Sequence, residues 1–358
     1  MREGTKPPGG APTICNSPAL SPFSRPMDSS TARQRFHDEL LARHLKTIFG
    51  EVESTALAHL RRHLRWIEIA GGETLMHQGE QGDSMYLIVS GRLRAYVRGA
   101  DGSERMVGEM ARGQTVGEMS LYTGEPRAAT VVAVRDSVLV RLGKSEFVPL
   151  LESSAQVSIA LTRQIVPRLK GAQRQQAHER PVAIGLVPVT AGVDAAAFAT
   201  DLAQQIGERL AQTQGQGRVR IVDAAQVHQA LADAGVSLDD ADPEARADAS
   251  RRVALLLDEI EATHDAVLLL ADAGPTAWTQ RCCRHCDELM LLADAAQPVA
   301  LHAVEQQFLM HRPPRTEVSE LLVLLHPAER RSPRGTAAWL ERRPLAGTDV
   351  HNHPLWRD

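Results

Sequence analysis

The sequence predicts an α+β chain of two domains, a jelly-roll-like β-roll followed by a parallel α/β domain. Three observations predict this fold class. Short apolar runs alternate with glycine-bearing turns over residues 66–142, helix-length segments alternate with continuous apolar runs after residue 181, and a polar stretch at 172–181 separates the two patterns. The 358 residues suffice for two domains of ordinary size.

The chain begins with a segment of low complexity. Residues 1–30 combine six prolines with many serines and glycines, a composition typical of disorder. We therefore expect a disordered tail over residues 1–32. Apolar residues then recur at helical spacing from about residue 35 to residue 64.

The pattern of the first half predicts a β-roll, because the expected strands are short and the turns recur regularly. Turn signals such as AGGE, HQGEQGD and RGADG recur every eight to twelve residues or so. The apolar runs that predict strands are WIEIA (66–70), MYLIV (85–89), LRAYV (93–97), TVVAV (130–134) and VLVRL (138–142). Helical spacing returns over 145–176, so the sequence predicts a domain at 33–172 that ends in this helix.

The second half follows the pattern of a parallel sheet. VAIGLVPV (182–189) is a continuous apolar run, as expected of a strand buried on both faces. A helical stretch at 194–212 follows, and further strands are expected at RVRIVD, AVLLLAD, ELMLLAD and ELLVLLH. We predict an α/β domain over 181–345 and a tail over 346–358.

Composition and charge limit the partners and the cellular location that we expect for this protein. A net charge of −4 gives no reason to expect nucleic acid. The four cysteines, three of them within residues 282–286, do not form the disulfide framework of a secreted protein. No apolar run approaches the ~20 residues that cross a bilayer. We expect a cytoplasmic protein, with attachment to the inner membrane surface as the alternative.

The candidate site lies in the stretch VGEMSLYTGEPRAATVVA (116–133). An arginine guanidinium binds a phosphate through two parallel hydrogen bonds, and backbone N–H groups at the start of a helical turn also bind anions. The candidate ligand-binding residues are Gly117, Glu118, Met119, Ser120, Arg127, Ala128 and Ala129. The alternative is a solvated Glu–Arg pair worth about 0–1 kcal/mol, but such a pair needs no glycine and proline around it.

This stretch, together with GGETLMHQGEQGDSMYLIVSGRLRAYV (71–97), resembles the cyclic nucleotide-binding domain of bacterial catabolite-type regulators, cyclic-nucleotide-dependent kinases and gated channels. The resemblance covers roughly residues 35–170. It implies that Arg127 binds the cyclic phosphate and that Glu118 accepts a hydrogen bond from the ribose 2′-hydroxyl. Guanine-selective members often carry a hydroxyl residue where this chain has Ala128, so the resemblance favours cAMP, with cGMP as the alternative ligand. No cofactor is implied.

Two segments of the second half, 182–206 and 263–294, resemble the region that precedes the catalytic part of neuropathy-target-esterase-like patatin phospholipases. The resemblance covers roughly residues 181–345 and implies a degenerate relative of partitioning-type ATPases. No lysine occurs after Lys170, so this half has no P-loop lysine. The G-x-S-x-G nucleophile motif of patatins is also missing. We therefore expect a non-enzymatic regulatory chain, whereas an intact family member would be a lysophospholipase-type hydrolase.

Other clusters are explained more simply. CCRHC (282–286) cannot supply the four ligands of a closed zinc site, so we expect buried helix cysteines and no metal. Arginines bias the last fifty residues or so towards positive charge. Contact with anionic lipid or with a patatin-type catalytic domain is an alternative there to a solvated surface.

The sequence thus predicts a sensor for a cyclic nucleotide that passes its signal through the 145–176 helix to the α/β domain. The alternative is the truncated regulatory portion of a patatin-like serine esterase. A transcription regulator is disfavoured because a buried strand, rather than a helix-turn-helix, follows the long helix. A scaffold with an inactive pocket and a homodimer through the 145–176 helix both stay open.

Overall fold

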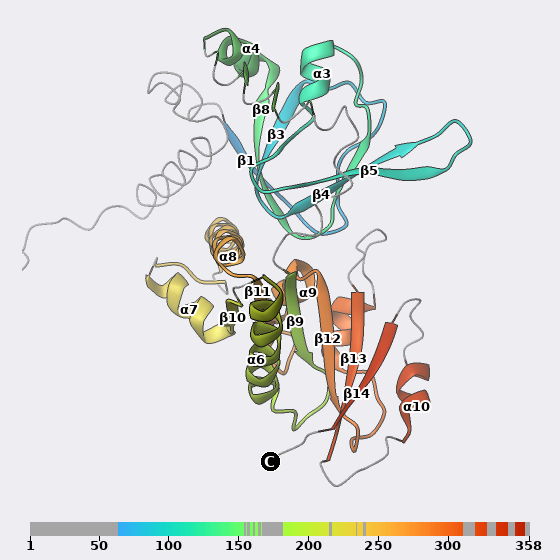
Figure 1. Ribbon diagram of the computed structural model, residues 1–358. Helices are drawn as coiled ribbons and strands as arrows, with labels where there is room; N and C mark the ends of the chain where they lie inside the picture. Colours follow the sequence, from blue (N-terminus) through green and yellow to red (C-terminus); the bar gives the residue numbers. More distant parts are fainter. Residues whose placement is uncertain are drawn as a thin grey trace, which may run out of the picture.

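A computed structural model describes residues 64–153, 182–214, 217–233, 235–238, 241–310, 319–327, 334–342 and 348–354, with a few positions between 155 and 166. The predictions for the tail at 1–32, for the helical spacing before residue 64 and for the linker at 172–181 lie outside the described residues. The two predicted domains are present, one above the other in Figure 1.

The first domain is a roll of two antiparallel four-stranded sheets. One sheet has the order β1-β8-β3-β6 and the other the order β2-β7-β4-β5. The strands are β1 (Arg65–Ile69), β2 (Thr74–Met76), β3 (Ser84–Ser90), β4 (Arg92–Arg98), β5 (Glu104–Ala111), β6 (Thr115–Val116), β7 (Thr130–Ala133) and β8 (Ser137–Gly143). All five strands expected from apolar runs in this half are thereby confirmed.

The interior of the roll is filled by alternate residues of facing strands, as the period of two requires. Ile88, Leu93, Val131 and Leu139 are at most 2% exposed and belong to one apolar cluster. The tight connection between β3 and β4 depends on Gly91, whose φ of 97° lies in the left-handed region. A Cβ at this glycine would also collide with Ser137.

Two short helices complete the described roll. Helix α3 (Glu118–Thr123) lies between β6 and β7, at the end of the roll away from the second domain (Figure 1). Helix α4 (Lys144–Ser153) follows β8 directly, which agrees with the helical period predicted from about residue 145.

The second domain is built on a six-stranded sheet whose neighbours are all parallel, in the order β10-β11-β9-β12-β13-β14. Its strands are β9 (Val182–Pro188), β10 (Val219–Val222), β11 (Ala266–Leu270), β12 (Glu288–Asp294), β13 (Ser319–His326) and β14 (Thr348–Pro354). The connecting elements are α6 (Ala195–Gln214), α7 (Ala224–Asp233), α8 (Pro243–Thr263), α9 (Ala277–His285), the π-helix η2 (Glu305–Leu309) and α10 (Thr336–Glu341).

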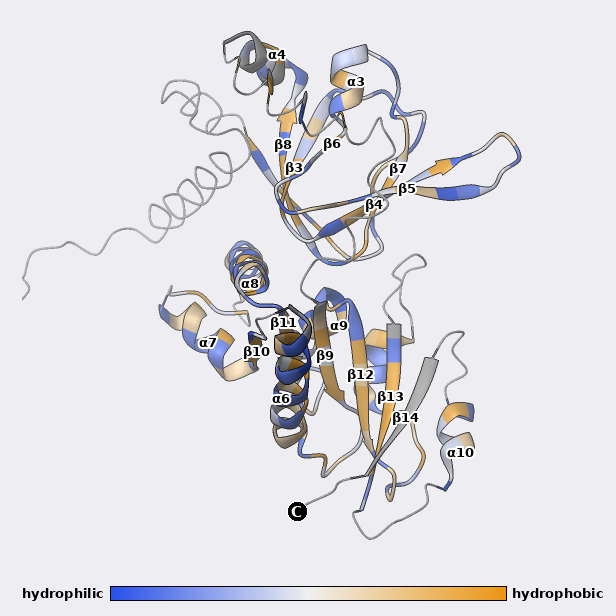
Figure 2. Cartoon of the chain, viewed as in Figure 1, coloured by the Kyte–Doolittle hydropathy of each residue, from blue (hydrophilic) through white to orange (hydrophobic). Residues whose placement is uncertain are grey.

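Helices cover both faces of this sheet, which is why its central strands are apolar (Figure 2). On one face, Leu186 and Leu268 pack beneath α6. On the other face, Trp278 of α9 and Leu257 of α8 join a larger buried cluster. The fold class predicted from sequence is therefore confirmed for both domains.

One prediction is corrected at the C-terminal end. The sequence assigns 346–358 to a tail, whereas residues 348–354 form β14 and pair with β13 along its whole length. The segment TDVHNHP has no apolar run, so its strand was not recognisable from periodicity. A parallel edge strand is formed by backbone hydrogen bonds to its neighbour, which do not depend on side-chain type.

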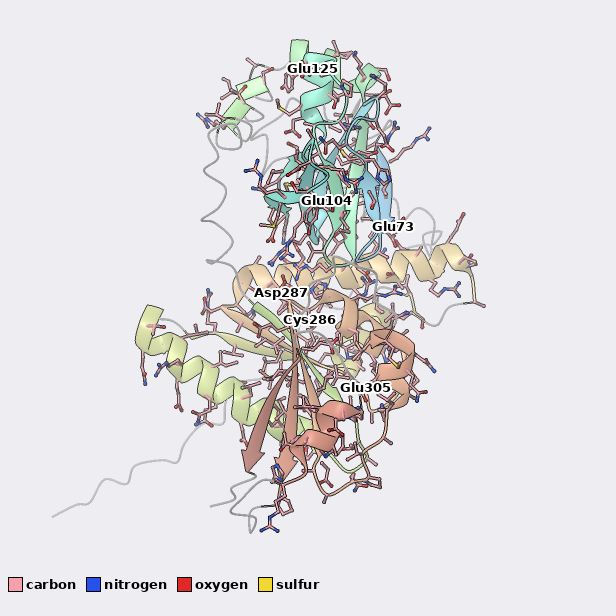
Figure 3. All side chains as sticks on the ribbon, turned by 90° about the vertical axis from the view of Figure 1, so that its right-hand side faces the viewer. Glu73, Glu104, Glu125, Cys286, Asp287 and Glu305 are labelled. Atoms are coloured by element: carbon pink, nitrogen blue, oxygen red, sulfur yellow. The ribbon has the colours of Figure 1, made fainter. Side chains whose placement is uncertain are left out.

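Helix α8 lies between the roll and the sheet, and Asp287 and Cys286 lie beside it at the domain boundary (Figure 3). Its side chains Ala249, Val253 and Leu257 recur every four residues and enter the core of the α/β domain. Three acids of this helix, Asp248, Asp258 and Glu261, are also buried, at 3%, 5% and 8% exposure. Among the described residues, no helix has the length and apolarity needed to cross a membrane.

Candidate functional site

The stretch singled out from the sequence forms a short helical turn between two glycines. Gly117 precedes α3 with φ 82° and Gly124 ends it with φ 73°, so both occupy the left-handed region where a side chain is strained. Within the turn, Glu118, Ser120 and Leu121 are buried. The glycine spacing thus fixes a compact loop whose acid points inward.

Arg127 closes this loop from its other end. Its guanidinium is 6% exposed, and it donates from Nη1 to the Gly117 carbonyl at 2.7 Å and from Nη2 to the Ser84 carbonyl at 2.7 Å. The arginine therefore bridges the start of α3 and the start of β3. Gly117 and Arg127, ten positions apart in sequence, are brought into direct contact.

The backbone of Arg127 is held as firmly as its side chain. Its N–H donates to the Glu80 carbonyl at 2.7 Å, and its own carbonyl accepts from the Gly79 N–H at 2.9 Å. The turn before β3 therefore fixes both the position and the direction of the side chain. A preorganised cation loses little conformational entropy when it binds an anion.

Close packing explains why small residues surround the guanidinium. A Cβ added at Gly82 would lie 2.6 Å from Ser120 Cβ and 2.9 Å from Arg127 Cζ, and one at Gly117 would lie 2.6 Å from Arg127 Nη1. Neither Gly82 nor Ser84 was among the candidate residues from sequence. Both lie in the GDSMY segment of the stretch that carries the family resemblance, which was the signal available for finding them.

The remaining candidate residues lie on α3 and directly after Arg127. Glu118 is 1% exposed, while Met119 and Ala129 are half-buried and Ala128 is exposed. Burial, followed by the charge of Glu118, raises the pKa of Tyr122 on the same turn. The acid and the arginine thus sit at one end of the roll with different surroundings, the arginine among carbonyls and the acid beside a phenol.

This arrangement can bind an anion with a fixed orientation. A guanidinium has five N–H donors, and the two carbonyls of Gly117 and Ser84 take one each. The other N–H groups can donate to phosphate oxygens. A charge-assisted bond to a buried guanidinium is stronger than one at the surface, since the local dielectric is lower.

The corresponding loop of the α/β domain, after β9, is built differently. Asp194 caps α6 by accepting from the Ala197 N–H at 2.9 Å, and Thr190 Oγ1 accepts from the Asp294 N–H at 2.8 Å. An acid therefore occupies the helix N-terminus where a P-loop would place a phosphate. This geometry agrees with the lack of a P-loop lysine.

The cysteines of the CCRHC segment are buried, as predicted. Cys282, Cys283 and Cys286 are at most 2% exposed and carry free thiols. Burial raises the pKa of Cys282 and of Cys286 well above the ordinary value, which keeps these thiols protonated. Within the described part of the chain, no cluster of histidine, cysteine or acidic side chains could hold a metal ion.

Family models match both domains. Residues 66–154 match the cyclic nucleotide-binding domain, and residues 182–354 match the Neuropathy Target Esterase family P-loop like domain. The second match extends through β14, in agreement with the corrected C-terminal boundary.

Curated relatives match most of this chain and are themselves much longer. Patatin-like phospholipase domain-containing protein 7 of Rattus norvegicus is 29% identical over 308 residues, which cover 80% of this chain and 21% of that protein. Lysophospholipase nte1 of Aspergillus oryzae is 29% identical over 307 residues, covering 80% of this chain and 19% of that protein. The chain thus spans about a fifth of the length of these relatives.

Among solved structures, the regulatory domain of Toxoplasma gondii PKA with cAMP aligns over 32% of this chain and 44% of that chain, with 29% identity and a TM-score of 0.31.

The two family matches and the two observed folds lead to one assignment. Residues 66–154 form a cyclic nucleotide-binding domain, and residues 182–354 form a P-loop-like domain of the Neuropathy Target Esterase family.

Proposed function

We propose that this chain is a regulatory segment that binds a cyclic nucleotide, cAMP in preference to cGMP, at the end of the roll that carries α3. Arg127 binds the cyclic phosphate, and Glu118 accepts a hydrogen bond from the ribose 2′-hydroxyl. The observation that carries this proposal is the buried guanidinium of Arg127, held by the carbonyls of Gly117 and Ser84.

A solvated Glu–Arg pair does not account for this geometry. Surface pairs contribute about 0–1 kcal/mol and need no buried position. Arg127 is instead buried among backbone carbonyls, and the packing of Gly82 against it requires a residue without a side chain. Burying a full positive charge in this way is costly, and an anionic ligand compensates part of that cost.

The preference for cAMP rests on one position. Ala128 is exposed beside Arg127 and has no hydroxyl group with which to hydrogen-bond a guanine. Replacing it by threonine should therefore raise the affinity for cGMP relative to cAMP, and an unchanged ratio would argue against a role for Ala128 in base selection.

Calorimetric titration of the whole chain with cAMP and with cGMP tests the proposal. Arg127→Ala should weaken cAMP binding about 100-fold or more, since two charge-assisted bonds at about 1.5–3 kcal/mol each are lost. Arg98→Ala is the matched control, because Arg98 is an exposed arginine of the same roll whose side chain is 67% accessible.

The outcomes separate clearly. Micromolar or tighter binding that is lost in Arg127→Ala and retained in Arg98→Ala supports the proposal. Absence of binding to either nucleotide by the unaltered chain contradicts it, as does binding that survives the loss of Arg127.

A second function is favoured by the comparisons. Two curated relatives are a patatin-like phospholipase domain-containing protein and a lysophospholipase, and this chain spans about a fifth of each. We propose that the sensor regulates a lysophospholipase-type catalytic domain, although the patatin nucleophile motif is absent from these residues. Hydrolysis of lysophosphatidylcholine by the native gene product, measured with and without cAMP, tests this; no hydrolysis under either condition would exclude it.

A further inference from the structure

The two strands that flank the cassette both lead to the same helix of the other domain. The cassette, defined here as residues 117–129, is preceded by β6 and followed by β7. It lies at the end of the roll away from α8 (Figure 1), whereas the turn before β6 and the turn after β7 each contact α8 through an ion pair. Each turn carries an arginine that pairs with an acid of α8.

The first of these contacts follows β7. Arg135 comes two residues after the strand, its side chain is 4% exposed, and it forms two bonds with the Glu261 carboxylate, Nη1 to Oε1 at 3.1 Å and Nη2 to Oε2 at 2.8 Å. Its Nη1 also donates to the His285 carbonyl of α9 at 3.2 Å. The strand that begins beside Arg127 therefore ends in a buried ion pair with the α/β domain.

The second contact precedes β6. Arg112 lies in the turn between β5 and β6, with its Nη1 2.8 Å from Asp258 Oδ2 and 3.2 Å from the Asp258 carbonyl. Asp258 and Glu261 are three residues apart on α8 and therefore occupy the same helix face. That face is acidic where the roll presents arginines, so the charges across the boundary are complementary.

A third ion pair between the roll and α8 lies away from the strands that flank the cassette. Glu68 of β1 pairs with Arg251 of α8 at 2.8 Å. Strand β1 lies at the edge of its sheet and pairs with β8, so it flanks neither end of the cassette. The boundary thus holds two kinds of contact of the same chemistry, which permits a matched comparison.

We propose that α8, through Asp258 and Glu261, couples the nucleotide site to the α/β domain by holding the far ends of both strands that flank the cassette. This inference rests on the proposed nucleotide binding. It adds a route distinct from the 145–176 helix, whose role stays a prediction because much of that segment lies outside the described residues.

The physical reason is that paired strands transmit displacement rather than absorb it. Strand β7 is hydrogen-bonded to β2 on one side and to β4 on the other, so it moves with its neighbours. A phosphate bound by Arg127 and the start of α3 therefore shifts the cassette and β7 together, and with them the position of Arg135 against Glu261. Coupling requires the two arrangements to differ in nucleotide affinity, and it acts equally in both directions.

The test uses the whole chain and three single variants. Glu261→Gln removes the ion pair at the end of β7, Asp258→Asn removes the ion pair before β6, and Glu68→Gln removes the pair that does not involve a strand next to the cassette. The bonds of Arg135 and Arg112 to backbone carbonyls are kept in all three variants. For each, the dissociation constant for cAMP is measured by calorimetry, and hydrogen exchange of the α8 amides is measured with and without cAMP.

We expect Glu261→Gln and Asp258→Asn each to shift the dissociation constant about fivefold or more, and Glu68→Gln to shift it less than about twofold. In the unaltered chain, cAMP should change exchange across the α8 turn that carries Asp258 and Glu261. That change should be lost in Glu261→Gln and kept in Glu68→Gln.

If Glu261→Gln does not fold, Asp258→Asn decides, because its former partner Arg112 is one-third exposed and can be solvated. Tight cAMP binding that is identical in all three variants overturns the coupling and leaves the proposed function intact. If the unaltered chain does not bind cAMP, both the coupling and the proposed function are overturned. In that case the titrations of the unaltered chain and of Arg127→Ala are identical.

Discussion

Arg135 of the roll and Glu261 of α8 form a two-bonded ion pair across the domain boundary, with both side chains at most 10% exposed. His285 Nε2 lies 2.6 Å from the Glu261 Oε1 atom, so three nitrogen atoms of two side chains converge on one carboxylate. Burial of this kind is costly unless every partner is present. The loss of either Arg135 or Glu261 should therefore destabilise the domain boundary.

Glu261→Gln should lower the free energy of unfolding by about 3–5 kcal/mol, because it leaves the buried Arg135 without its two-bonded carboxylate and with Asp287 Oδ1, 4.0 Å from Nη1, as its remaining counter-charge. Urea unfolding followed by tryptophan fluorescence measures this. Glu68→Gln is the control: the Glu68 side chain is 33% exposed, and its loss should cost only about 0–1 kcal/mol. Equal losses in the two variants would show that burial does not distinguish these pairs.

Lowering the pH should destabilise the domain boundary, because it protonates the Glu261 carboxylate. Burial by itself raises the pKa of this carboxyl, but the charges of Arg135 and His285 outweigh burial and lower the pKa from 4.5 to about 2. The stabilisation is therefore complete above pH 4.5 or so and is lost as the pH falls towards 2. Unfolding free energies measured between these limits should decline in the unaltered chain.

Asp258 changes the pH dependence of stability in the opposite direction. Burial raises its pKa above 3.8, so the ionised form is disfavoured in the folded chain and protonation on acidification relieves that cost. Glu261→Gln should consequently flatten the acid dependence between pH 4.5 and 2, whereas Asp258→Asn should steepen it. The same slope in both variants would refute this assignment.

Gly82→Ala should disturb the nucleotide site, because its Cβ would lie within 3 Å of Ser120 and of the Arg127 guanidinium. Overpacking of this kind costs about 1–3 kcal/mol, and displacement of the guanidinium should weaken cAMP binding as well. Gly274→Ala is the control, since nothing lies within 4 Å of its added Cβ. Normal cAMP affinity in Gly82→Ala would show that the guanidinium position is not critical.

The cap of α6 can be tested separately. Asp194→Ala should destabilise the α/β domain by about 1 kcal/mol, since the Ala197 N–H loses its acceptor. Asp194→Asn retains a side-chain oxygen and should keep nearly full stability. The two variants are compared by thermal unfolding of the whole chain, and equal stability would mean that water replaces the cap without cost.

Much of the fold could be predicted from local sequence. Five strands of the roll and the buried strand β9 followed from apolar runs, because side-chain periodicity directly reflects which faces are buried. Strands β2, β5 and β6 were not predicted. Strand β14 was missed, since an edge strand with a polar sequence leaves no such pattern. Gly82 and Ser84 were missed as site residues because their contacts with Arg127 span about forty residues of sequence.

The sequence by itself determined the two fold patterns, the turn glycines Gly117 and Gly124, and the placement of Glu118 and Arg127 around one short loop. These depend on interactions between residues close together in the chain, which a sequence displays directly. Only the tertiary structure decided that Arg127 bonds the Ser84 carbonyl and that Arg135 meets Glu261, 126 positions away. Contacts of this range depend on how finished sheets and helices pack, and burial then turns an ordinary arginine and glutamate into an ion pair that holds two domains together.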